Sequence, residues 1–252
     1  MRIGVALFRL RPERTAAVAR HAEALGFESV WVPEHLVLPT RIASRYPYAP
    51  DGVPPFAPDA PHLDPLILLT HVAAATSRIR LGTSIYLLPL RHPLVSARLA
   101  LSLDVLSGGR LTLGVGVGWL AEEFQAAGIE FRTRAARTRE CVRALRALWT
   151  EAAPEFHGRF FSFGPVKFEP KPESAAAQAG KLRALLAAAG RGAAPFELTV
   201  SHAGGLLTPD DVRRYTDAGI ARVVVLPWQR GSEAEEALAR QAAALGLSGG
   251  AM

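Results

Sequence analysis

Short apolar runs alternate along the chain with longer segments in which apolar residues recur at helical spacing. The runs are rich in Val, Leu and Ile, which is typical of strands that are buried on both faces in a parallel sheet. This alternation predicts an α/β fold built on such a sheet. About six core strands are expected, and they span residues 3–8, 29–33, 79–88, 110–117, 196–201 and 222–227.

Proline, glycine and capping residues mark the ends of the predicted helices. Asp64 and Pro65 supply an N-cap and a first-turn proline for a helix that continues to about residue 75. Pro93 begins another helix, which Gly108 and Gly109 end. Further helices are expected over residues 15–25, 135–150, 181–189 and 209–219, and a hairpin is expected over residues 155–168.

Two segments depart from this regular pattern. Residues 36–62 are rich in proline and aromatic side chains, and they are too many for an ordinary connection, so they predict a functional loop over the carboxyl edge of the sheet. Gly114, Gly116 and Gly118 fall at alternate positions of a predicted strand. Because glycine weakens a strand, its use there indicates that another group approaches the backbone closely.

Residues that could take part in catalysis or ligand binding lie at the ends of three of the predicted strands. Glu34 and His35 come after the second strand, Ser84 and Ile85 lie within the third, and residues 116–119 end the fourth. In parallel α/β folds the carboxyl ends of the strands meet at one edge, and ligands bind there. These three segments are therefore expected to converge on one site.

Composition narrows the class of protein. The chain has 252 residues, which suits a single barrel domain over residues 1–252. The first apolar run is broken at Arg9 and Arg11, so neither a signal peptide nor a membrane span is expected. A cytoplasmic location is expected instead. Cys141 is the one cysteine, and no Cys/His spacing predicts a metal site. The net charge of +6 is spread over the chain without an aromatic-basic repeat, so we expect no nucleic-acid partner.

Several motifs occur in the order in which they occur in one known family. They read GFESVWVPEH, RIRLGTSIYLLPLRHP and LSGGRLTLGVGVGWLAEEFQAAG, followed by FRTRAARTRE and ALW. Together they resemble the luciferase-like monooxygenases, and in particular the branch that uses the deazaflavin F420. The resemblance implies a (β/α) barrel of the TIM type, with F420, or alternatively FMN, across its mouth. It also implies hydride transfer or monooxygenation of a small organic substrate.

The resemblance assigns roles to individual residues. It places His35 beside the reactive edge of the cofactor ring as a catalytic residue, with Glu34 in the acidic position before it. Ser84 and Ile85 fall on the family's cis peptide, which supports the ring face, and residues 117–119 (Val117, Gly118 and Trp119) fall on the strand end that touches the ring.

Simpler interpretations of the same residues stay open. His35 is also consistent with a scaffold role, Glu34 with a salt bridge to a neighbouring loop, and Ser84 with plain strand. Trp119 stands where some F420 enzymes have a glutamate that donates a proton. Glu122 and Glu123, one turn further on, are weaker substitutes for it.

The family pattern breaks after FEPKP, near residues 172–180, where two strand and helix units are missing. The missing part normally holds the cofactor phosphate. An incomplete barrel of about six strands is therefore expected, with the strands at 110–117 and 196–201 either separated by a gap or brought together by local rearrangement. The hairpin, the helix over 181–189 or a second subunit is expected to cover the gap, since exposed edges invite pairing.

The same deletion leaves a second function open, which is a non-catalytic or weakly flavin-binding remnant that serves as a partner subunit. Against it, His35 and the fourth strand end are retained. The family commonly pairs through helices near the second and third strands, so a homodimer is expected.

Overall fold

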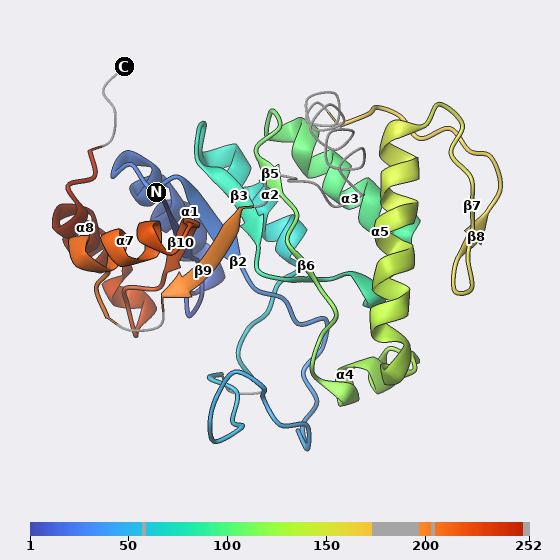
Figure 1. Ribbon diagram of the computed structural model, residues 1–252, viewed down its shortest axis with the longest axis horizontal. Coiled ribbons are helices and arrows are strands. Elements are labelled where there is room, and N and C mark those ends of the chain that lie inside the picture. The colour runs from blue at the N-terminus through green and yellow to red at the C-terminus, as the bar shows by residue number, and fades with distance from the viewer. Residues whose placement is uncertain (57–58, 173–196, 203–204, 249–252) are drawn as a thin grey trace.

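A parallel sheet forms the centre of the computed structural model, which describes residues 1–56, 59–172, 197–202 and 205–248 (Figure 1). Within these residues six strands pair in the order β5-β3-β2-β1-β10-β9, and every pair is parallel. The expected α/β fold with about six core strands is confirmed. The strands are β1 (Arg2–Ala6), β2 (Ser29–Val32), β3 (Arg80–Thr83), β5 (Leu111–Thr112), β9 (Leu198–His202) and β10 (Ile220–Val225).

Two of the predicted strands are shorter than expected. The third ends at Thr83, and the chain then leaves the main sheet at Ser84. It forms β4 (Tyr86–Leu87), which pairs with β6 (Val115–Gly116) in a separate parallel ribbon. The fourth predicted strand is likewise divided into β5 and β6. Beyond the carboxyl ends of β3 and β5, the two chain segments therefore pair with each other and no longer belong to the main sheet.

Helices connect the strands, and their starts follow the predicted signals. Asp64 accepts hydrogen bonds from the N–H groups of Leu66 (2.9 Å) and Ile67 (3.2 Å), as expected of an N-cap. The α-helices are α1 (Pro12–Ala24), α2 (Pro65–Ala75), α3 (Pro93–Leu106), α4 (Ala121–Ala126), α5 (Arg134–Thr150), α7 (Pro209–Asp217) and α8 (Ala234–Leu245). Short 3-10 turns are η1 (Leu88–Leu90), η2 (Phe131–Thr133) and η3 (Gly231–Glu233).

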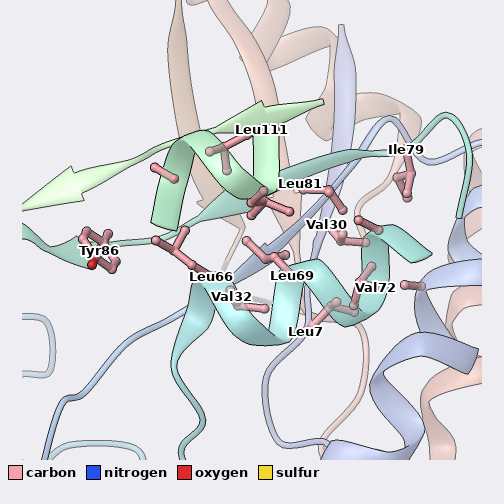
Figure 2. Close-up of a cluster of buried hydrophobic side chains, with 14 of the residues drawn as sticks. Leu7, Val30, Val32, Leu66, Leu69, Val72, Ile79, Leu81, Tyr86 and Leu111 are labelled. Carbon is pink, nitrogen blue, oxygen red and sulfur yellow. The ribbon is translucent and has the colours of Figure 1, made fainter. Parts of the chain in front are cut away.

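The main core lies between the outer face of the sheet and its helices. Figure 2 shows Leu66 and Leu69 of α2 pointing toward Val30 of β2 and Leu81 of β3. All four side chains are at most 1% exposed. Alternate residues of each strand point to this face, so the apolar set of every strand packs against a helix.

The opposite face of the sheet is organised around one large side chain. The indole of Trp31 lies across β1 and β3, where Gly4 and Gly82 leave room for it. Its Nε1 donates a hydrogen bond to Ser29 Oγ at 2.9 Å. A Cβ on Gly82 would lie 2.3 Å from Trp31 Cε3. Glycine is therefore required at these positions because the indole approaches the backbone closely.

The sheet does not close into a barrel within the described residues, and β5 and β9 form its two edges. The expected gap between these strands is confirmed. Of the three expected covers, the hairpin is ruled out, because β7 (Phe156–His157) and β8 (Ser162–Phe163) lie on the outer side of α5 (Figure 1), while the helix over 181–189 and a second subunit stay predictions. Glu140 holds the hairpin there by accepting the N–H groups of Arg159 and Phe160, both at 2.9 Å.

Two further expectations fall on residues that the structure does not describe. The helix over 181–189 and most of the deletion near 172–180 lie within the undescribed residues 173–196. Both expectations stay predictions.

Replacing Gly82 by alanine tests the packing of Trp31. The added methyl group would overlap the indole, so we expect Gly82→Ala to lower the free energy of unfolding by about 1–3 kcal/mol. Gly164→Ala is the matched control, because nothing lies within 4 Å of its Cβ position. Urea unfolding of both variants provides the measurement, and equal effects at the two positions would contradict the packing.

Candidate active site

Hydrogen bonds join the three strand ends that carry the candidate site residues. The N–H of Ser84 donates to Val32 O at 2.7 Å, which links the end of β3 to the end of β2. The N–H of Tyr86 donates to Gly114 O, also at 2.7 Å, and so links the β3 end to the β5 end. The Ser84–Ile85 peptide is cis, as predicted. The expected convergence of these segments on one mouth is therefore observed.

His35 lies at this mouth and is held by a buried carboxylate. Its Nδ1 is 3.1 Å from Glu123 Oε2, and Glu123 Oε1 accepts the N–H of Leu36 at 2.6 Å. The side chains of His35 and Glu123 are 9% and 1% exposed. From the sequence, Glu123 is expected only as a weak substitute for a proton donor. The signal that was available is its place in the acidic first turn of α4.

Aromatic side chains surround the His35 ring. The ring centroid of His35 is 5.0 Å from that of Phe56, 5.7 Å from that of His62 and 6.1 Å from that of Trp119. Tyr46 extends the cluster, with its ring 5.1 Å from Trp119. Phe56, His62 and Tyr46 come from the long loop over residues 36–62, which confirms that this loop lies over the carboxyl edge. The cluster limits the access of water to His35.

Glu34 lies beneath the mouth. It is 5% exposed, its Oε1 is 2.5 Å from Arg91 Nη1, and its Oε2 accepts the N–H of Leu87. Arg91 also pairs with Asp64 at 2.9 Å. Burial raises the pKa of Glu34, and the charge of Arg91 opposes that shift. The carboxylate thus ties the end of β2 to β4, as the salt-bridge interpretation of this residue anticipated.

Apolar side chains remain exposed around the same mouth. Ile85, Val115 and Val117 are 37%, 37% and 40% exposed. Gly116 lies under the side chain of Ile85, whose Cδ1 would be 1.9 Å from a Cβ on that glycine. Gly118 has a φ of 81°, in the region that favours glycine, and it lies between Val117 and Trp119. The strand ends therefore present an apolar surface within two residues of the cluster around His35.

Comparison with known proteins identifies the family of this chain. A sequence profile described as luciferase-like monooxygenase matches residues 4–243. The chain belongs to this family. An uncharacterized protein of Mycobacterium tuberculosis (strain ATCC 25618 / H37Rv) is 30% identical over 253 residues, which cover 86% of this chain and 87% of that protein.

Two further comparisons describe relatives with a stated activity. The F420-dependent glucose-6-phosphate dehydrogenase of Kineococcus radiotolerans is 36% identical over 166 residues, which cover 64% of this chain and 44% of the dehydrogenase. The monooxygenase RslO1 from Streptomyces bottropensis shares the fold of this luciferase-like protein, with a TM-score of 0.72 and 24% identity. That alignment covers 97% of this chain and 98% of the other.

Within the described part of this luciferase-like chain, no group of three or more His, Cys, Asp or Glu side chains is arranged to hold a metal ion. No described helix is both long enough and apolar enough to cross a membrane.

Glu122, next to Glu123, fixes the middle of the long loop. Its carboxylate accepts hydrogen bonds from Ser44 Oγ (2.7 Å) and from the N–H groups of Ala43 (2.7 Å) and Ser44 (2.9 Å). Burial alone raises the pKa of Glu122, but these hydrogen bonds outweigh it and lower the pKa to about 2. Figure 1 shows α4 and the loop at the same end of the molecule. Two neighbouring carboxylates of α4 therefore hold the loop at two places.

The low pKa of Glu122 makes its contribution to stability depend on pH. Ionised Glu122 stabilises the fold above its ordinary pKa of 4.5, and that contribution is lost as the pH falls toward about 2. We expect Glu122→Gln to lower the free energy of unfolding by about 1 kcal/mol at pH 7, given partial screening by solvent. The deficit should shrink as the pH falls to about 3.

Urea unfolding at both pH values provides the measurement. Glu151→Gln, at an exposed position, is the control and should have little effect at either pH. A deficit of Glu122→Gln that is the same at both pH values would contradict the assignment.

Proposed function

We propose that this protein is an oxidoreductase that binds a flavin or deazaflavin at the open mouth and transfers hydride between it and a small organic substrate. The observation that carries the proposal is His35, held by buried Glu123 and lying beside exposed apolar strand ends. Catalytic imidazoles are commonly oriented by a carboxylate in this way. Membership of the luciferase-like family supports the same reaction class.

The residues present fit a flat heteroaromatic ring. Ile85 and Val117 offer apolar side chains that are exposed although large, as expected of a surface that a ligand covers. Val117, Gly118 and Trp119 would lie along the ring, with Ser84 and Ile85 supporting its face. When bound, such a ring supplies the hydride donor or acceptor. F420 is favoured because a relative at 36% identity is an F420-dependent dehydrogenase, and FMN is the alternative.

His35 is proposed to exchange a proton with the substrate. Because a carboxylate only accepts hydrogen bonds, Nδ1 carries the hydrogen that points to Glu123. No hydrogen bond to Nε2 is found among the described residues, so this nitrogen is available to exchange the proton. The aromatic side chains around the ring exclude water and orient the substrate. Glu34 is proposed as a positioning residue, since its carboxylate is occupied by Leu87 and Arg91.

The protein is also proposed to form a homodimer. Large apolar side chains are exposed on the two helices that flank β3, namely Ile67 (58%) on α2, with Val95 (51%) and Leu106 (71%) on α3. On α3, positions 95 and 106 share one helical stripe. A second copy that covers these residues would remove their apolar side chains from water.

Cofactor binding tests the ring surface. We expect F420 to bind more tightly than FMN in fluorescence titrations, and Val117→Asp to weaken binding by roughly tenfold or more because the ring would desolvate the new carboxylate. Val105→Asp, at a similarly exposed position on α3, is the matched control and should bind as the wild type does. Failure of the wild type to bind either cofactor would contradict the proposal and favour the non-catalytic partner subunit.

Turnover tests the role of His35. A screen of alcohols and sugar phosphates for cofactor reduction supplies a substrate, and His35→Ala is then expected to lower kcat by roughly 10² to 10⁴. Cofactor affinity should change little, since the ring would lie on Ile85 and Val117. His157→Ala, in the exposed hairpin, is the control. Turnover of His35→Ala within a few-fold of the wild type would show that His35 is scaffold.

A further inference from the structure

A cavity of about 380 Å³ opens beside the mouth, between the end of β1, the start of α1 and the loop residues 55, 56 and 60–63. Its walls are mainly apolar, and they include Leu7, Phe8, Val32, Pro61, Leu63 and Leu68. This volume lies in the range of sites that hold small organic molecules.

The charges that line the cavity have one sign. Arg9 and Arg11 line it, and no Asp or Glu occurs among its described lining residues. The guanidinium of Arg9 donates only to neutral oxygens, Gln229 Oε1 at 2.6 Å and Pro55 O at 3.4 Å. The guanidinium of Arg11 has no hydrogen bond or ion pair to another described residue. The cavity therefore presents two positive charges that the described part of the protein does not neutralise.

The backbone around Arg9 is fixed in an unusual conformation. Arg9 has a φ of 59°, and no other non-glycine residue in the described ranges has a positive φ. Gly231 permits this path, because a Cβ there would lie 2.5 Å from Arg9 O. Trp228 Nε1 donates to Phe8 O at 2.9 Å and so holds the preceding residue. Backbone strain that the surrounding structure maintains is found at functional sites, where it preorganises a side chain.

The cavity shares two of its lining residues with the aromatic cluster around His35. Phe56 and His62 line it, and the rings of both contact the His35 ring, at 5.0 and 5.7 Å. A molecule that occupied the cavity would therefore lie against two rings that contact His35.

We propose that this cavity is the subsite for the non-reacting part of the substrate, and that it selects an apolar body that carries a carboxylate or phosphate group. The anion binds Arg9 and Arg11, the apolar body lies against Leu7, Leu63 and Leu68, and the reactive carbon lies at His35. The proposal rests on the proposed function, and it adds the class of substrate.

Calorimetric titration with three probes of matched chain length tests it: octanoate, octyl phosphate and 1-octanol. At least one of the two anions should bind roughly tenfold or more tightly than the alcohol, because a charge-assisted hydrogen bond is lost with the charge. The tighter of the two anions identifies the head group. Equal affinities for all three probes, or no binding of either anion by folded protein, would overturn the proposal.

The double variant Arg9→Asn/Arg11→Gln assigns the effect to the cavity. Asparagine is chosen because it adopts a positive φ more readily than other side chains. The variant should lose the preference for the anion and keep the affinity for 1-octanol. Arg132→Gln/Arg213→Gln removes the same charge from exposed residues outside the cavity, and it should bind all three probes as the wild type does. Anion binding that survives in the cavity variant would overturn the assignment.

Titration of the same proteins with F420 and FMN separates this inference from the proposed function. Anion binding without cofactor binding would overturn the proposed function and leave the anion subsite in place. Cofactor binding without anion binding would overturn the subsite alone.

Discussion

The mouth of this sheet depends on one buried carboxylate. Glu123 comes from α4, yet its side chain reaches the end of β2 and accepts hydrogen bonds from Leu36 N (2.6 Å), Val37 N (3.4 Å) and His35 Nδ1 (3.1 Å). A buried carboxylate without such donors would carry a large desolvation penalty. The same contacts that satisfy it therefore set the orientation of the imidazole and the start of the long loop.

The layers below the mouth make that geometry possible. Trp31 crosses the sheet where Gly4 and Gly82 admit it, and Glu34 with Arg91 ties the end of β2 to β4. Trp31 and Glu34 are buried, so their contacts are shielded from water and fix how the strand ends lie relative to one another. Ile85 and Val117 remain exposed at the mouth, and they lie near the oriented imidazole of His35. Under the proposed function, this exposed apolar surface would hold the ring cofactor, and the oriented imidazole would act as the acid or base beside it.

The features that could be predicted from the sequence are those that depend on local signals or on the family resemblance. The Asp64 cap, the parallel strands and the convergence of Glu34, Ser84 and Val117 follow from spacing and from the rule for strand ends. The bond between His35 and Glu123 could not be predicted, because 88 residues separate them and no periodicity links them. The hairpin was one of three expected covers for the gap, but its position is set by Glu140 and α5, and this tertiary packing could not be predicted from the sequence of the hairpin.

A double-mutant cycle on His35 and Glu123 tests the central claim, that the two side chains form one unit. The free energy of unfolding is measured in urea for the wild type, His35→Asn, Glu123→Gln and the double variant. Because the two groups share a buried hydrogen bond, a coupling energy of about 1–3 kcal/mol is predicted. Losses that add to within about 0.5 kcal/mol would show that the residues act independently and would contradict the account.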